Sequence, residues 1–154
     1  MHGHIFDHFA VEYEYPNGVR MFSQCRQING CESKVEESFV GTKGTAACGG
    51  FGSNCHTQTA GGEAWRYRGE NPDAYHQEHQ DLIDSIRAGQ PLNEAQTVAE
   101  STLTGIMGRE SAYSGQSIEW DKALNSPTRL GPEKYEFGAF PVPPVALPGK
   151  YRFV

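Results

Sequence analysis

The stretch LNEAQTVAESTLTGIMGRESAYSGQSIEWDKALN (residues 92–125) predicts a long capped helix that ends in a glycine turn and leads into a short strand carrying Trp120. We expect this helix from about Asn93 to Tyr113, with Gly115 as its left-handed terminator. One side carries an apolar stripe of the kind that packs on a sheet: Ala95, Val98, Ala99, Thr102, Ile106 and Met107. The stretch therefore requires a sheet elsewhere in the chain.

The first third of the chain is predicted to supply that sheet. From Ile5 to Tyr15 the residues alternate between an apolar side and a second side that holds Phe6, His8, Glu12 and Glu14. A tight turn at residues 16–18 then predicts a hairpin whose second strand runs from Val19 to Ile28. Further strands are expected over residues 35–40, 45–48 and 63–68, with a surface loop over the glycine-rich residues 49–62.

A second helix is predicted before the long one. Asn71 is the expected N-cap, Pro72 the first helical residue and Gly89 the end, and the apolar side consists of Tyr75, His79, Leu82, Ile83 and Ile86. Strands first and helices later favour an α+β fold, an open-faced antiparallel sheet with helices packed on one face. We expect this domain to span residues 1–125 and the proline-rich residues 126–154 to form an extended arm along the body or along a neighbouring subunit.

Composition limits the partners. A chain of 154 residues is long enough for one compact domain and too short for a nucleotide-binding domain plus a substrate domain. The net charge of -6 comes from acidic and basic residues mixed along the chain, which disfavours nucleic acid, and no apolar run is long enough to span a membrane. The sequence leaves two cellular locations as alternatives, the cytoplasm and the periplasm. The spacing of Cys25, Cys31, Cys48 and Cys55 favours free thiols, with one disulfide or a metal as the alternatives.

Five segments carry a resemblance to a known family. They are FDHFAVEYEYPNG (6–18), VGTKGTA (40–46), AWRYRG (64–69), QEHQDLIDSIRAGQPLNEAQTVAESTLTGIMGR (77–109) and SAYSGQSIEWDKALNS (111–126). In this order, over most of residues 5–125, they resemble the C-terminal domain of the glucose-fructose oxidoreductase, inositol dehydrogenase and MocA (Gfo/Idh/MocA) family. The resemblance implies an open-faced sheet that binds substrate beside a separate N-terminal NAD(P)-binding domain and commonly forms the oligomer interface.

The catalytic and cofactor motifs of that family are missing from the sequence. There is no GxGxxG fingerprint after a first strand, no Glu-Lys-Pro stretch with its catalytic lysine, and no Asp and His motif on a helix opening the domain. Residues 50–55 (GFGSNC) carry Cys55 where the third glycine would stand, so they are interpreted as a flexible loop. We therefore expect no catalytic residue and no cofactor in this chain, and NAD or NADP in the N-terminal domain of a full-length parent.

Five residues are candidates for contact with a sugar-like substrate. Gln24 and Arg26 share one face of the predicted second strand and can bond hydroxyls or a carboxylate, although a polar subunit interface would use them equally. Trp65 and Tyr67 offer flat surfaces on which sugar rings stack, and core or interface aromatics are the alternative. His79 is either a substrate contact or a packed histidine bonded to backbone.

The N-terminal histidines His2, His4 and His8 would share one face of an extended segment, but exposed terminal residues explain them better than a metal site, and none is predicted. Two functions remain open. The first is the substrate-binding and oligomerisation domain of an NAD(P)-dependent oxidoreductase acting on a sugar, polyol or related hydroxyl compound. The second is a non-catalytic carbohydrate-binding or assembly module. A homo-oligomer is expected through the open sheet face, where Phe6, Phe22 and Trp65 would otherwise form an exposed apolar patch.

Overall fold

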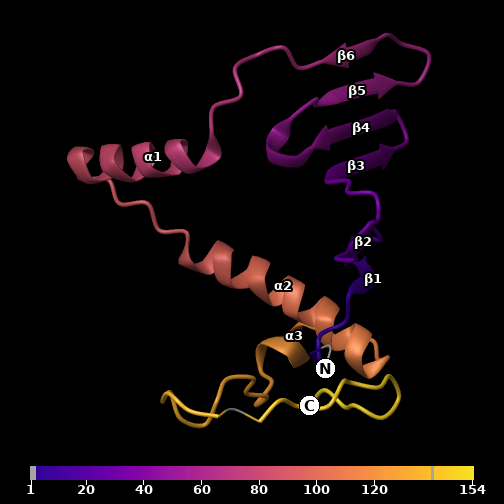
Figure 1. The fold of residues 1–154 in the computed structure, drawn as a ribbon. Helices are drawn as coiled ribbons and strands as arrows, with labels where there is room; N and C mark the ends of the chain where they lie inside the picture. Colours follow the sequence, from indigo (N-terminus) through magenta and orange to yellow (C-terminus); the bar gives the residue numbers. More distant parts are fainter. Residues whose placement is uncertain (1–2, 140) are drawn as a thin grey trace. The chain divides into compact units, whose positions relative to one another are not determined.

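The computed structural model describes residues 3–139 and 141–154, and the chain divides into two units. Figure 1 shows their elements. The hairpin unit combines the residues up to Gly30 with those from Glu94 onward, and contains β1 (His8–Glu14), β2 (Arg20–Arg26), α2 (Ala95–Ser114) and α3 (Trp120–Leu124). The sheet unit, Cys31–Asn93, contains β3 (Glu36–Gly41), β4 (Gly44–Gly49), the 3-10 turn Gly50–Gly52, β5 (His56–Thr59), β6 (Ala64–Arg66) and α1 (Ala74–Ala88).

The predicted N-terminal hairpin is confirmed. β1 and β2 pair antiparallel with Val11 opposite Ser23, and the turn between them places Gly18 at φ 79°, a conformation that glycine adopts without strain. The amide of Gly18 bonds the carbonyl of Tyr15 at 2.8 Å. The expected alternation is present along β1, whose half-buried residues are Phe9, Val11 and Tyr13.

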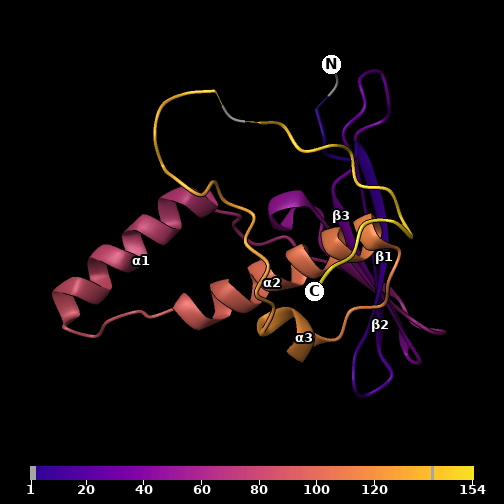
Figure 2. The same ribbon diagram turned by 90° about the horizontal axis from the view of Figure 1, so that it is seen from below.

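Helix α2 packs on the face of the hairpin that carries those three residues (Figures 1 and 2). The Tyr13 hydroxyl donates to the backbone carbonyl of Thr104 at 2.9 Å. Gly108 makes this approach possible, because a Cβ at that position would lie 2.1 Å from the Tyr13 hydroxyl oxygen. α2 and β1 therefore lie close together because Gly108 has no side chain between them and because Tyr13 bonds the backbone of α2.

The apolar stripe predicted for α2 is only partly correct. Ile106 and Met107 are half-buried, whereas Ala95, Val98, Ala99 and Thr102 are exposed. The buried residues of the helix lie in its C-terminal half and are Gly108, Glu110, Tyr113 and Ser114. Small and polar residues replace the expected apolar ones here because Gly108 allows close packing and Glu110 and Ser114 have hydrogen-bond partners.

Two details near the ends of this unit differ from the sequence-based expectation. Trp120 begins the helix α3 instead of a strand. Asp121 lies in the first turn of α3 and Lys122 in its last turn, so both charges interact favourably with the helix dipole. Phe6 lies before β1, so the strand alternation does not apply to it. Its ring packs edge-on against Tyr113 at 4.7 Å between ring centroids, which removes it from the expected surface patch.

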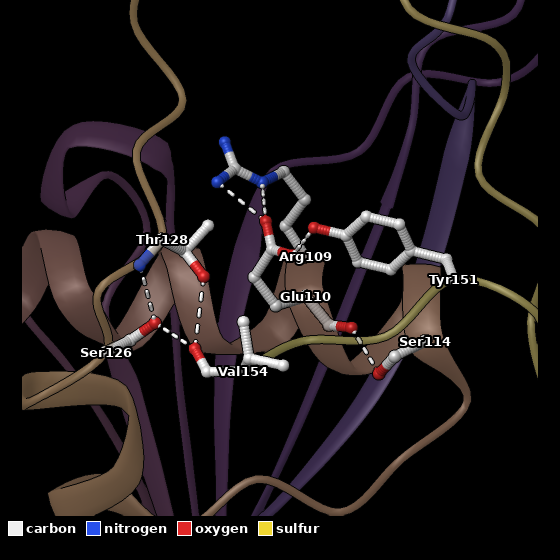
Figure 3. A network of polar contacts seen from close by, with 7 residues as sticks. All are labelled: Arg109, Glu110, Ser114, Ser126, Thr128, Tyr151 and Val154. Carbon is white, nitrogen blue, oxygen red and sulfur yellow. Dashed lines mark hydrogen bonds and ion pairs between the residues drawn. The ribbon is translucent and has the colours of Figure 1, made fainter.

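The C-terminal arm has no helix or strand in its described residues, 126–139 and 141–154, and its last residues pack on α2 and α3. Figure 3 shows the polar contacts that fix it. The Tyr151 hydroxyl donates to Oε2 of Glu110 at 2.7 Å, while the guanidinium of Arg109 holds Oε1 at 2.9 Å. Glu110 is only 1% exposed, so this carboxylate is a buried anchor for the arm.

The sheet unit contains a four-stranded antiparallel sheet of order β3-β4-β5-β6. The strands beginning near residues 36, 44 and 64 agree with the sequence-based expectation, but the predicted surface loop 49–62 contains β5, which pairs with both of its neighbours. A disulfide joins Cys48 to Cys55 and closes the loop before β5. The expectation of four free thiols was therefore wrong for this pair, and Cys25 and Cys31 are the free cysteines of the described chain.

Helix α1 is present, but it starts later than predicted. Asp73 is its N-cap, and the Asp73 carboxylate accepts the amide of His76 at 2.9 Å. Asn71, the expected cap, instead donates to the carbonyl of Phe51 at 3.3 Å. Gly89 ends the helix at φ 66°, as expected. Aspartate immediately before the helix outcompetes an asparagine two residues away because its oxygen reaches the first free amides.

Two antiparallel sheets and three α-helices in the described part of the chain confirm the α+β class. The strands form two separate sheets where a single one was expected. Helix α2 covers one face of the two-stranded sheet, as predicted for the long helix.

Candidate functional site

An open groove of about 1330 Å³ lies along β1 in the hairpin unit. Residues 10–15 of β1 and the turn form one wall, and the C-terminal half of α2 with residues 115–120 forms the other. β2 contributes only Arg20, so the groove follows the side of β1 that does not pair with β2. Figure 2 shows β1 and α2 adjacent to each other here.

The groove is lined by both polar and apolar residues. Arg20 forms ion pairs with both Glu12 and Glu14, the second at 3.2 Å. Burial raises the pKa of the Tyr13 hydroxyl above its usual value, and the nearby Tyr15 adds to that rise. Tyr13 is therefore a neutral donor committed to Thr104. Such a groove can bind a partner through backbone and carboxylate groups.

Gln24 and Arg26 lie on β2, opposite Ala10 and His8 respectively, and neither lines the groove. They share a face with Phe22, which is 67% exposed and precedes Gln24 on that face of the strand. That face is opposite to the one that α2 covers, since residues of one strand alternate between faces. These residues therefore form an exposed polar and aromatic row, as the sequence pattern predicted.

The other three candidates belong to the sheet unit. Trp65 on β6 and Tyr67 just beyond it are exposed, and their rings lie 6.3 Å apart between centroids at an angle of 57°. The Tyr67 hydroxyl donates to the carbonyl of Glu70. His79 lies on α1 with Nδ1 2.6 Å from the carbonyl of Tyr75, and its side chain is exposed. Only Trp65 and Tyr67 of the five candidates are brought together by ring contact.

Metal binding by residues 3–139 and 141–154 would require a cluster of ligating side chains. These residues contain no group of three or more His, Cys, Asp and Glu side chains with the geometry to hold a metal ion. His2 falls outside the described residues, so the N-terminal histidine cluster is not tested. The glycine-rich residues 50–52 form a 3-10 turn inside the disulfide-closed loop and lead into β5 rather than into a helix.

Comparisons with protein-family models, with curated proteins and with solved structures return no match for this chain. Among the residues that the structure describes, no helix has both the length and the apolar character needed to cross a bilayer.

The groove was not predicted from the sequence, although two signals for it are present. A glycine in the middle of a helix, Gly108, indicates close approach of another element. A strand of alternating Glu and aromatic residues without a second predicted neighbour indicates an open edge. Neither signal alone locates the opposite wall, which includes the irregular residues 115–119 beside α2.

Proposed function

We propose that this chain is the substrate-binding and oligomerisation domain of an NAD(P)-dependent oxidoreductase that acts on a sugar, polyol or related hydroxyl compound. The oligomerisation part of this proposal is carried by one observation, the total solvent-accessible surface area of 13456 Å². A folded monomer of 17.0 kDa exposes about 7,700 Å², and two independent globules of the sizes of the two units expose about 9,300 Å². The excess of roughly 4,000 Å² exceeds what a standard protein interface buries.

The exposed side chains support the same proposal. Large apolar residues lie at the surface of both units, among them Phe22, Phe39, Trp65 and Ile86. Covering exposed apolar side chains with other protein surface removes them from water, which is favourable. Such a chain is suited to be one part of a larger assembly.

The substrate and cofactor parts of the proposal rest on the resemblance described above. Under this proposal the chain supplies shape and hydrogen bonds, while NAD or NADP and the catalytic groups belong to the N-terminal domain of the parent. Gln24 and Arg26 would bond hydroxyl or carboxylate groups of the substrate. A non-catalytic carbohydrate-binding module is the second candidate, and the exposed pair Trp65 and Tyr67 favours it because sugar rings stack on such surfaces.

Calorimetric titration tests the proposal. The purified chain and the complete gene product are each titrated with NAD, NADP, NADPH and a series of sugars and polyols, and the complete product is assayed for dinucleotide reduction. We expect dinucleotide binding and turnover by the complete product only. Dinucleotide binding by this chain alone would refute the proposal, and sugar binding by a complete product without turnover would favour the carbohydrate-binding module.

Two variants assign the substrate contacts. Gln24→Ala and Trp65→Ala each test one candidate cluster, and Tyr135→Ala, which removes a fully exposed aromatic from the arm, is the matched control. Weaker sugar binding by one of the first two variants identifies its cluster as the binding site. Equal binding by all three would exclude both clusters.

A further inference from the structure

Among the described residues, no strand bonds the backbone groups on the edge of β1 that faces the groove. The carbonyl of Asp7 accepts the amide of Gln27, and the amide of Tyr15 bonds the carbonyl of Val19, so the odd-numbered residues turn their backbone groups towards β2. In an antiparallel ladder these directions alternate along the strand. The even-numbered residues His8, Ala10, Glu12 and Glu14 therefore present their N–H and C=O groups to the groove.

We propose that β1 pairs edge to edge with β1 of a second copy of this chain, antiparallel about Val11, to form a continuous four-stranded sheet. This inference rests on the assembly part of the proposed function and names its contact. In this register Val11 lies opposite its own copy, Ala10 opposite Glu12, Phe9 opposite Tyr13 and His8 opposite Glu14. It is the register that pairs all seven residues of β1 and places the even-numbered residues in hydrogen-bonded pairs.

Charge supports this register. It sets the His8 ring, a hydrogen-bond donor, opposite the Glu14 carboxylate, and no two carboxylates face each other directly. Moving the two-fold axis to Glu12 would place Glu12 opposite its own copy, and like charges in direct opposition destabilise a strand pair. Moving the axis to Ala10 leaves Glu14 beyond the paired strand. The pattern of β1 therefore selects the centre at Val11.

The outer edge of β2 is the competing contact, and its charges disfavour it. Pairing of β2 with its own copy about Ser23 would place Arg20 opposite Arg26. β1 and β2 thus offer edges of the same length, one with complementary ends and one with repelling ends. The groove also lies along β1 and not along β2, which leaves space for an added strand on the favoured side.

The odd-numbered face adds side-chain contacts. Phe9 and Tyr13 of one copy meet Tyr13 and Phe9 of the other in pairs without backbone hydrogen bonds, where side chains are closest. Aromatic pairs across strands stabilise such sheets. The contact is isologous, so it closes at two copies and does not continue into a fibre.

Sedimentation equilibrium of the full chain with two matched proline variants tests the pairing. Ala10→Pro removes an N–H that points to the free edge of β1 and leaves the hairpin ladder intact. Gln24→Pro is the control, because Gln24 is the cross-strand partner of Ala10 and its N–H points to the outer edge of β2. We expect a dimer whose dissociation constant rises at least tenfold in Ala10→Pro and stays within twofold in Gln24→Pro.

Cysteine cross-linking tests the register independently of folding losses in the proline variants. In a Cys25→Ser, Cys31→Ser background, Val11→Cys places two thiols at the two-fold axis, where paired residues have Cα atoms about 4.5 Å apart, within disulfide range. We expect a covalent dimer on mild oxidation. Ser23→Cys, at the equivalent position of β2, is expected to stay monomeric on a denaturing gel.

Three results would overturn the inference. A dimer that both proline variants weaken equally, or that cross-links through Ser23→Cys and not Val11→Cys, would retain the assembly function but place the contact elsewhere. A monomer of 17.0 kDa at tens of micromolar would refute both the edge pairing and self-assembly of this chain. Sugar binding in the titration is independent of all three, so the two proposals fail separately.

Discussion

The helices α1 and α2 both end at a left-handed glycine, and both carry apolar residues along one side. Their surroundings differ. α2 packs on β1 and buries Tyr113, whereas Leu82, Ile83 and Ile86 of α1 remain exposed. No residue from 31 to 93 is buried, although every residue of that range is described.

This difference between the two units shows what stabilises each of them. In the hairpin unit, the N-terminal segment, a helix and the C-terminal arm share one cluster of aromatic side chains around Tyr113, whose ring has edge-on contacts with Phe6 and Tyr151. In the sheet unit, backbone ladders and the Cys48–Cys55 disulfide hold the strands without a buried core. Capping and periodicity in the sequence thus predict that a helix forms, but they do not predict whether another element packs on it.

The largest expected effect is in amide hydrogen exchange. Amides in residues 110–114 of α2 should exchange at least about a thousand times more slowly than amides in residues 82–86 of α1, because exposed elements with few buried contacts open at little cost in free energy. Exchange followed by NMR or mass spectrometry in the isolated chain measures both segments at once. Equal protection would mean that α1 is covered in solution, and repeating the measurement at a tenfold lower concentration would show whether a second copy covers it.

The second largest effect concerns stability. Removing the buried charge of Glu110 on α2 should destabilise the chain more than removing an exposed charge on α1. Glu110→Gln removes the charge that Arg109 and Tyr151 bind, and we expect the free energy of unfolding to fall by about 2 kcal/mol, the usual value for hydrogen bonds to a charged group. Glu78→Gln is the matched control on α1, where the contact to His79 is exposed, and it should change stability by less than about 0.5 kcal/mol. Urea denaturation followed by circular dichroism measures both, and similar losses would contradict the structural role of Glu110.

Alanine substitutions at two glycines of α2 should change stability by smaller amounts and in opposite directions. A Cβ at Gly108 would meet the Tyr13 hydroxyl, so Gly108→Ala should break the Tyr13 bond to Thr104 and destabilise the chain by about 1 kcal/mol. Gly105 has open space around its Cα, so Gly105→Ala should stabilise the helix by about 0.5–1 kcal/mol. The difference in thermal midpoint between the two variants is the measurement. A gain in both would show that α2 does not contact β1 in solution.

Local signals predicted the elements of this chain better than their contacts. The hairpin turn at Gly18 and the helix ends at Gly89 and Gly115 follow from residues that adopt positive φ, and each is confirmed. β5 was missed because Thr57 and Thr59 alternate within a glycine-rich stretch that resembles a loop. Its pairing partners are β4 and β6, the strands immediately before and after it in the chain, so the error lay in recognising the strand and not in placing it.

The candidate site was predicted even less completely. Sequence alternation correctly placed Gln24 and Arg26 on one exposed strand face, but it could not show that Trp65, Tyr67 and His79 belong to another unit. The buried Glu110 was missed because a charged residue in a helix is usually exposed, and its partner Tyr151 is 41 residues away. A buried contact between residues so far apart in the sequence requires the tertiary structure.

The smallest expected effect is a pH dependence in the hairpin unit. Burial, together with the hydrogen bond and negative charge of Glu110, raises the pKa of Tyr151 to about 12 from its ordinary value of 10.0. The folded chain therefore holds this proton more tightly than the unfolded chain, and the resulting stability is complete below pH 10 and is lost as the pH rises towards 12. Urea midpoints measured between pH 9 and 11.5 should fall in the native sequence and fall less in Tyr151→Phe, where a weaker slope from Tyr13 remains because its pKa is also raised. Slopes of equal size in the two proteins would show that the contact between the arm and Glu110 does not persist in solution.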